Sequence, residues 1–297
     1  MRDIIFEGAA TALITPFSYD SYIDYKAVEK LIEYQLRENI QAIVVAGTTG
    51  ESATLNDEEH YELVKFTVDA VAGRVPVIAG AGSNCTEHAR RLCRNSKRAG
   101  ADALLVVTPY YNKSNLKGLV HHYRTCSEAA EGELPIIVYN VPSRTGLNIK
   151  PEYYESILEI ETVAAIKEAS GNMSQVTRIM ADYGNEISVY SGNDDLILPV
   201  LSVGGKGVIS VVSNLIPGEI QQICKDFMAR KQERSRNMML HYMKLVDAMF
   251  MDVNPVPIKE AMGLYGFGSG SVRAPLFCLD EEKKTVLTNL LKKYHIL

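Results

Sequence analysis

The chain has 297 residues, of which 46% are hydrophobic and 23% are charged, and this composition is ordinary for a globular protein. Its 31 Lys and Arg against 36 Asp and Glu give a formal net charge of −5, so nothing indicates a surface for nucleic acid or membrane binding. The five cysteines show no C-x-x-C spacing and no apolar stretch reaches ~18 residues, so we expect a cytoplasmic protein without a disulfide framework, a zinc site or a membrane span.

Eight short, β-rich apolar runs follow one another along the chain, and each has Gly, Pro, Asn or another polar residue at or near its end. The runs are nearly continuous rather than alternating, which is typical of strands buried on both faces of a parallel sheet. They are ATALITPF near residue 10, QAIVVAG at 41, VPVIAGAG at 75, ALLVVTP at 103, PIIVYNVP at 135, VAAIKEA at 163, ISVYSGN at 187 and GVISVVSN at 207.

Helical patterns lie between these runs. Residues 24–39 carry apolar side chains at i, i+3, i+4 and i+8, with Gln35 at i+7, which predicts one helical face. Residues 56–73 begin with Asn56, have acidic residues in the first turn and end at Gly73, which predicts a capped helix. A strand followed by a helix, repeated about eight times, is therefore the rhythm of the chain.

This rhythm predicts an α/β fold, a (β/α)8 TIM barrel, for residues 1–225. An open, doubly wound sheet is the competing interpretation, but it usually has fewer strands. Its dinucleotide fingerprint is also missing, because Gly80 and Gly82 are not followed by the later glycine.

The strand rhythm stops after about residue 225. What remains has helical character, and two prolines in NPVP precede one of the expected helices, as is common near a helix start. We expect residues 226–297 to form a helical extension packed on the barrel, with helices over 228–250, 255–264 and 280–295.

The active site of such a barrel lies at the C-terminal ends of its strands. The segments expected there bring hydroxyls, small residues, one lysine and one arginine to one rim: GTTGES at 47–52, TPYYN at 108–112, YNVPSRTG at 139–146, KEASGN at 167–172 and SGNDD at 191–195. All six histidines fall in helical patterns instead, so neither a Ser–His–Asp hydrolase nor a histidine metal site is supported. Asp194 and Asp195 could bind a cation, but adjacent acids after a strand more often begin a helix, so no metal is expected.

Lys167 directly follows four apolar residues, although lysine is almost never fully buried unless something compensates its charge. One interpretation is a structural ion pair with Glu168 or another acid. The other is a nucleophilic amine, because burial disfavours the ammonium and lowers the pKa. Alternation along the strand directs Glu168 to the opposite face, which weakens the ion-pair interpretation for that residue.

Other chemical groups are expected on the same rim as this lysine. Tyr139 could move protons beside an amine, and Arg144 could bind a carboxylate with its forked guanidinium. Each has a structural alternative: Tyr139 could be a packing tyrosine, Arg144 a solvated loop residue, and Thr48 and Thr49 turn caps. Their meeting on one barrel rim favours chemistry over these separate structural explanations.

These ordered motifs resemble the dihydrodipicolinate synthase family of pyruvate-dependent class I aldolases over essentially the whole chain, from ALITPF through GTTGESATL, TPYYN, YNVPSRTG, IKEASGN, SGND and GVISV to NPVPIKEAM. The resemblance implies condensation of pyruvate with aspartate 4-semialdehyde through a lysine Schiff base to give 4-hydroxy-tetrahydrodipicolinate, in diaminopimelate and lysine biosynthesis. It implies no metal or organic cofactor, and a homotetramer built as a dimer of dimers.

Two alternatives stay open at this point. An N-acetylneuraminate lyase or a 2-keto-3-deoxy sugar acid aldolase would use the same imine chemistry, although Arg144 and GTTGE favour the synthase. A catalytically silent barrel is the other alternative, and the presence of Thr48, Tyr139 and Lys167 beside Arg144 argues against it.

The resemblance implies roles for individual residues. Lys167 is the Schiff-base lysine, Tyr139 the proton donor and acceptor, and Thr48 a proton relay. Tyr111 completes the relay from the neighbouring subunit.

The resemblance also implies the substrate contacts. Thr49 holds the pyruvate carboxylate, and the backbone at Gly192 and Ile209 lines the pyruvate pocket. Arg144 receives the carboxylate of aspartate 4-semialdehyde.

An allosteric lysine site is a further expectation from the resemblance, with matching residues Ser52, Ala53, His60 and Asn84. However, Asp57 stands where the family usually has a histidine, and His88 where it usually has a glutamate. The missing glutamate would contribute charge toward the amine of lysine, so we expect feedback inhibition to be weak or absent.

Overall fold

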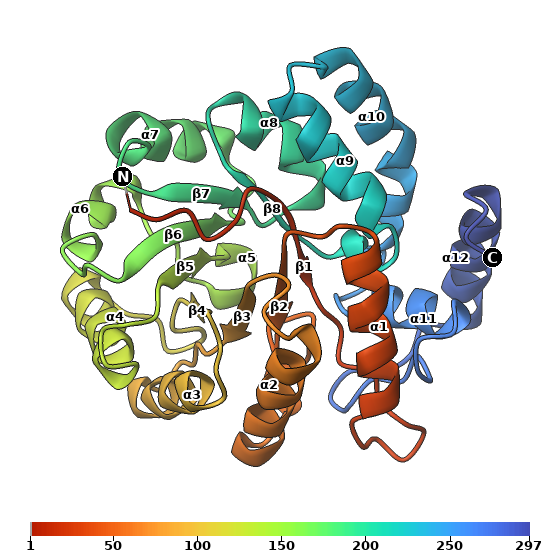
Figure 1. The fold of residues 1–297 in the computed structure, drawn as a ribbon, viewed down its shortest axis with the longest axis horizontal. Coiled ribbons are helices and arrows are strands. Elements are labelled where there is room, and N and C mark those ends of the chain that lie inside the picture. Colours follow the sequence, from red (N-terminus) through yellow and green to blue (C-terminus); the bar gives the residue numbers. More distant parts are fainter. Residues whose placement is uncertain (1) are drawn as a thin grey trace.

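Eight parallel strands close into a barrel in which each strand pairs with the next in chain order and β8 pairs with β1 (Figure 1). The computed structural model describes residues 2–297. The predicted (β/α)8 barrel is confirmed, and the doubly wound alternative is wrong. The strands are β1 Gly8–Ala12, β2 Ala42–Val45, β3 Val77–Gly80, β4 Ala103–Val107, β5 Ile136–Asn140, β6 Val163–Glu168, β7 Ser188–Ser191 and β8 Gly207–Ser210.

Helices lie around the outside of the barrel. The predicted helical patterns correspond to α1 Tyr25–Arg37 and α2 Asp57–Val71. Asn56 caps α2 in a full capping box, because the Glu59 carboxylate accepts a hydrogen bond from the Asn56 N–H. The other elements up to β8 are η1 Ser52–Thr54, α3 Thr86–Arg98, α4 Leu116–Ala129, α5 Pro142–Thr145, η2 Pro151–Tyr153, α6 Tyr154–Ile157, α7 Met173–Tyr183, η3 Asp194–Leu196 and α8 Ile197–Ser202.

Both faces of the strands are buried, as the continuous apolar runs predict. One face packs against the helices, and the other fills the barrel interior with a separate cluster that includes Ala10, Val44 and Tyr139. Lys167 on β6 is in register with Tyr139 on β5 and with Tyr190 on β7. The register therefore brings a lysine and a tyrosine to the same level of the barrel.

The C-terminal part is helical, as expected. After η4 Val212–Asn214 come α9 Pro217–Met228, α10 Gln232–Ala248, α11 Val256–Leu264 and α12 Glu281–Lys293, with α10 beside α9 in Figure 1. The prediction of a helix from 228 was wrong at its start, because Arg230 adopts a left-handed φ of 61° and separates α9 from α10. Residue 225, the expected boundary, lies inside α9. Every helix within residues 2–297 is too short or too polar to cross a membrane.

Candidate active site

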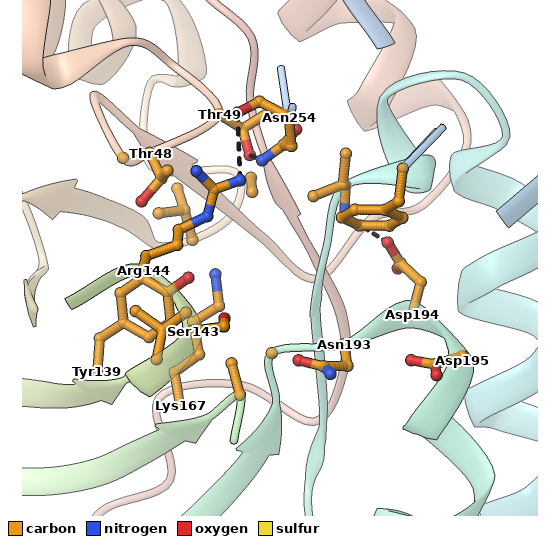
Figure 2. Close-up of a pocket in the computed structure, with 18 of the residues that line it drawn as sticks. Thr48, Thr49, Tyr139, Ser143, Arg144, Lys167, Asn193, Asp194, Asp195 and Asn254 are labelled. Carbon is orange, nitrogen blue, oxygen red and sulfur yellow. Dashed lines mark hydrogen bonds between the residues drawn. The ribbon is translucent and has the colours of Figure 1, made fainter. Parts of the chain in front are cut away.

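A cavity of about 510 Å³ lies at the C-terminal ends of the strands (Figure 2). It gathers residues from the loops after β2, β5, β6 and β7 and from the C-terminal helices. Its polar and charged lining consists of Thr48, Thr49, Tyr139, Ser143, Arg144, Lys167, Asn193, Asp194, Asp195, Asp247 and Asn254. The structure thus brings together six of the residues singled out in the sequence: Thr48, Thr49, Tyr139, Arg144, Lys167 and Gly192.

Lys167 lies on the inner face of β6, is 5% exposed and lines this cavity. Its Nζ lies 4.3 Å from the centroid of the Tyr139 ring, and Figure 2 shows the amine beside that ring. Within residues 2–297, the ammonium forms no ion pair with a carboxylate. Burial lowers the pKa of Lys167 to about 7, an effect that the Asp194 charge opposes and the Arg144 charge strengthens. A large share of the lysine is therefore free amine at neutral pH.

Glu168, the next residue, points away from the cavity, as strand alternation predicts. Its Oε1 accepts from the Ser170 N–H at 2.8 Å, and its Oε2 accepts from Asn140 Nδ2 at 3.0 Å and Gln175 Nε2 at 3.2 Å. The carboxylate is satisfied by neutral donors on the other face of the sheet. The interpretation of Lys167 as the ion-pair partner of Glu168 is therefore wrong.

Tyr139 is 6% exposed and lies at the end of β5. Burial raises the pKa of its phenol, while the Arg144 charge and the nearby Thr48 hydroxyl partly lower that pKa again. The phenol is therefore protonated at neutral pH, and the Thr48 hydroxyl lines the same cavity. This arrangement can give a proton to an oxygen near Lys167 and recover it through Thr48.

The loop after β2 carries both threonines. Thr49 is 3% exposed, and its Oγ1 accepts from Asn254 Nδ2 at 3.1 Å. Glu51, two residues later, has a left-handed φ of 54° and is buried in an ion pair with Lys259 of α11. Sequence reasoning missed Asn254 and Lys259, because they are separated from this loop by more than 200 residues and only tertiary folding brings them to it.

Arg144 lies on the short helix α5, directly after β5. Its guanidinium reaches into the cavity, and Nη2 donates to the Asn254 carbonyl at 3.2 Å (Figure 2). Gly146, with φ of 69°, ends the helix in the left-handed region. The other nitrogens of the fork are available for a substrate carboxylate.

Gly192 lines the cavity next to Lys167. A Cβ at this position would lie 2.6 Å from the Ala169 Cβ and 3.2 Å from Lys167 Cε, so glycine leaves the lysine its space. Ile209 is fully buried on β8 and lies in the cluster that fills the barrel interior. The cavity wall on this side is formed by Val211, and a pyruvate contact at Ile209 stays a prediction.

Asp194 was expected to begin a helix rather than bind a cation, and it does lie at the start of η3. It is 2% exposed, and its Oδ2 accepts from the backbone N–H groups of Val211 at 3.0 Å and Val212 at 3.1 Å. Burial raises the pKa of its carboxyl, and the charge of Lys167 lowers it. Sequence reasoning missed this electrostatic link, which makes Asp194 the acid that influences Lys167.

Tyr111 lies outside the cavity of its own chain. It is 90% exposed, has a left-handed φ of 69°, and its N–H donates to the Thr145 carbonyl at 3.2 Å. A large aromatic side chain presented this openly has no packing role within residues 2–297.

The residues of the expected lysine site lie around η1 and the starts of α2 and α3. His60 is 2% exposed and its Nε2 donates to the Gly80 carbonyl at 2.7 Å, while Ser52, Ala53 and Asn84 are at least partly accessible. The two departures from the family pattern contact each other, with Asp57 Oδ1 2.8 Å from His88 Nε2. Arg91 adds a second contact to Asp57 at 3.3 Å.

Comparison with known proteins gives one consistent result. The model of the "Dihydrodipicolinate synthetase family" matches residues 5–294. A 4-hydroxy-tetrahydrodipicolinate synthase of Caldicellulosiruptor bescii is 47% identical over 98% of each chain. The dihydrodipicolinate synthase structure from Aquifex aeolicus has a TM-score of 0.95 at 39% identity and covers 98% of this chain and 99% of its own. A chloride-inhibited dihydrodipicolinate synthase from Acinetobacter baumannii, complexed with pyruvate, has a TM-score of 0.95 at 35% identity, covering 99% of this chain and 100% of its own.

Proposed function

The chain belongs to the dihydrodipicolinate synthetase family and has 4-hydroxy-tetrahydrodipicolinate synthase activity in lysine and diaminopimelate biosynthesis, and we propose that Lys167 carries this reaction as a Schiff-base nucleophile. Pyruvate is its substrate, as in the pyruvate complex of the Acinetobacter baumannii relative. The observation that carries the proposal is the setting of Lys167: a buried amine at a cavity, with a lowered pKa and no ion-pair partner in the described chain.

The first half of the reaction activates pyruvate. The free amine of Lys167 attacks C2 of pyruvate to give a carbinolamine, which loses water to become a protonated imine. The imine draws electrons from C3, which loses a proton and leaves an enamine. The protonated imine is itself the electron sink, so these steps need no metal or organic cofactor.

The second half forms the ring and frees the enzyme. The enamine C3 attacks the aldehyde carbon of aspartate 4-semialdehyde, which forms the carbon–carbon bond and restores the imine. The amino group of the second substrate then attacks C2, closes the six-membered ring and expels Lys167 as an amine. One water leaves overall, in the imine-forming step.

The hydroxyl groups near Lys167 carry out the proton transfers in these steps. Tyr139 has the protonated phenol that carbinolamine formation and collapse need, and Thr48 supplies a second hydroxyl in the same cavity. Tyr111 extends this relay from a neighbouring subunit, and its exposure in the single chain supports a role at another copy. We therefore propose a homotetramer built as a dimer of dimers, in which each site borrows one tyrosine.

Two carboxylate positions follow from the same geometry. Thr49, with the backbone at Gly192 and Ile209, holds the pyruvate carboxylate near Lys167. Arg144 receives the carboxylate of aspartate 4-semialdehyde with the donors that Asn254 leaves free. Residues 226–297 form the extension that closes this side of the cavity, through Val246, Phe250 and Asn254 among others.

Feedback inhibition by lysine is expected to be weak or absent, although Ser52, Ala53, His60 and Asn84 provide part of a binding site. The geometry supports this, because the carboxylate of Asp57 already contacts His88 and forms an ion pair with Arg91. Calorimetry showing micromolar lysine binding would overturn this expectation.

A two-substrate assay tests the proposed function. Pyruvate with aspartate 4-semialdehyde should turn over, while N-acetylneuraminate and 2-keto-3-deoxy sugar acids should be cleaved at least about a hundredfold more slowly, because Arg144 offers a carboxylate fork where a sugar chain needs hydroxyl-binding groups. Faster cleavage of a sugar acid than condensation would contradict the assignment of the second substrate.

A further inference from the structure

Asn254 lies outside the barrel, in the short connection between α10 and α11, yet it lines the active-site cavity. It is 7% exposed and is the point at which the C-terminal extension contacts two residues of the barrel rim. Figure 2 shows it next to Thr49, with the Arg144 guanidinium reaching toward it. These two neighbours are the two groups to which carboxylates are assigned above.

The side chain of Asn254 is hydrogen-bonded to the hydroxyl of Thr49. Its Nδ2 donates to Thr49 Oγ1 at 3.1 Å, and this is the only side-chain hydrogen bond that the hydroxyl makes within residues 2–297. A hydroxyl carries one hydrogen, so an oxygen that accepts from an amide keeps its own hydrogen for another partner. The Thr49 hydrogen is therefore left for the cavity, where a carboxylate oxygen would accept it.

The main chain of Asn254 contacts the other carboxylate group. Its carbonyl accepts from Arg144 Nη2 at 3.2 Å. This bond uses one edge of the guanidinium and fixes its direction, and it does not depend on which side chain stands at position 254. Side-chain and main-chain contacts can therefore be separated by substitution.

The segment that carries Asn254 is anchored to the same loop by a second contact. Lys259, at the centre of α11, forms a buried ion pair with Glu51, two residues after Thr49. The Lys259 Nζ also lies 3.8 Å from the centroid of the Phe17 ring. This buried ion pair joins the loop after β2 to α11, which holds the Asn254 amide beside the Thr49 hydroxyl.

An asparagine is a poor choice here for packing alone. Its Oδ1 is buried without a hydrogen-bond partner in the described part of the chain, which is a cost that an apolar side chain of similar size avoids. The Nδ2 donor is the part of the side chain with a partner, and that partner is Thr49.

We propose that Asn254 is a positioning residue, which orients the Thr49 hydroxyl to donate to the pyruvate carboxylate while its carbonyl steers Arg144 for the second substrate. The proposal rests on the proposed function, because it takes the Thr49 position as the pyruvate carboxylate site. The C-terminal extension is then part of substrate recognition, although it supplies no group to the chemical steps.

Two near-isosteric substitutions test it in steady-state kinetics. Asn254→Leu removes the amide donor and should raise the KM for pyruvate about tenfold, the effect of one oriented hydrogen bond. Asn254→Asp should raise that KM about a hundredfold, because a carboxylate only accepts, so it takes the Thr49 hydrogen and repels the pyruvate carboxylate. The KM for aspartate 4-semialdehyde should change less than about threefold in Asn254→Leu, since the main-chain contact to Arg144 remains. Asn237→Asp, the same change on the exposed face of α10, should leave both KM values unchanged.

A double-mutant cycle with Thr49→Val separates positioning from general disturbance of the site. In the Thr49→Val background there is no hydroxyl to orient, so Asn254→Leu should raise the pyruvate KM by less than about twofold. An equal increase with and without the hydroxyl would overturn the proposal, and so would an unchanged pyruvate KM in either Asn254 variant. If one variant does not fold, the other decides by the same criterion.

Adduct formation at Lys167 and the pyruvate KM of the Asn254 variants test separate claims. If the wild-type protein forms no reducible pyruvate adduct at Lys167, the proposed mechanism is wrong. If the adduct forms but the Asn254 variants keep wild-type pyruvate KM values, only the positioning role is wrong.

Discussion

Lys167 and Lys259 are two buried lysines in similar physical surroundings. They are 5% and 1% exposed, and each ammonium lies over an aromatic ring, at 4.3 Å from the Tyr139 centroid and 3.8 Å from the Phe17 centroid. Burial is the leading cause of a lowered pKa in both, to about 7 for Lys167 and about 8 for Lys259. Neither burial nor the pKa therefore distinguishes them.

The two lysines differ in their partners and in the space beside them. Lys259 has the carboxylate of Glu51, which opposes the fall of its pKa, and it does not line the active-site cavity. Lys167 lines that cavity and has no ion-pair partner in the described residues. A buried lysine with a carboxylate partner is a structural ion pair, whereas one with only a cavity beside it can react.

Conservative substitution of each lysine should give the largest difference in activity between the two positions. Lys167→Arg keeps a long basic side chain but cannot form the imine, so kcat/KM should fall at least about 10⁴-fold. Lys259→Arg keeps both charge and pairing with Glu51, and its kcat/KM should stay within about tenfold of wild type. Initial rates of condensation measure both; a large loss in the second variant with little loss in the first would reverse the assignment.

The free energy of unfolding should respond in the opposite order, with the larger loss on substitution of Lys259. Lys259→Met leaves Glu51 buried without its ion-pair partner, with only the Arg273 N–H donating to its carboxylate, and should lower the free energy of unfolding by about 3–5 kcal/mol. The Glu51→Gln/Lys259→Met pair should recover much of this loss. Lys167→Met removes a buried, unpaired amine and should leave that free energy unchanged or raise it by about 1 kcal/mol or more. Urea unfolding followed by circular dichroism measures these values. A loss in Lys167→Met equal to that in Lys259→Met would show that Lys167 is also structural.

The difference in unfolding free energy between Lys167→Met and the wild-type protein should depend on pH. The folded-state pKa of Lys167 is about 7, below its unfolded value, so the unfolded chain binds more protons between these two pKa values. The cost of burying this lysine is complete below pH 7 and fades as pH rises above it. Any advantage of Lys167→Met should therefore shrink as pH rises.

The pH dependence of imine formation tests whether Lys167 reacts as a lysine with a lowered pKa. Only the free amine attacks pyruvate, and its fraction grows as pH rises toward the Lys167 pKa of about 7. The rate of trapping with pyruvate and cyanoborohydride should rise about tenfold per pH unit well below 7 and level off above it. A rate that keeps rising toward pH 10 would indicate an ordinary, solvent-exposed lysine.

Substitution of Asp194 should produce the smallest effect, a shift in the pH profile of pyruvate trapping. Its charge raises the pKa of Lys167, so Asp194→Asn should move the midpoint of the trapping profile to lower pH by up to about one unit. The asparagine oxygen can still accept from the Val211 and Val212 N–H groups, so the loop should stay in place. A shift to higher pH, or none, would show that Asp194 does not influence the lysine electrostatically.

Much of this fold was predictable because its signals are local. The eight apolar runs and the cap at Asn56 determine strands and a helix start from neighbouring residues alone. The position of Lys167 at the end of a strand, with Tyr139 at the end of the strand before it, followed from the same pattern, since parallel strands bring their C-terminal ends to one rim.

The rest of the site depended on contacts that the sequence pattern does not encode. Asn254 and Lys259 reach the loop after β2 only through the packing of the C-terminal helices. Asp194 was placed correctly at a helix start, but its effect on Lys167 comes from burial of both side chains. The start of α10 was missed because a single left-handed residue, Arg230, interrupts an otherwise helical pattern.

The most direct test of the difference between the two lysines is to find which one pyruvate modifies. The protein is reduced with borohydride in the presence of pyruvate, digested, and its peptides are sequenced by mass spectrometry. Our account predicts one reduced pyruvate adduct, on Lys167, with Lys259 unmodified. An adduct on Lys259 or on another lysine, or none at all, would contradict it.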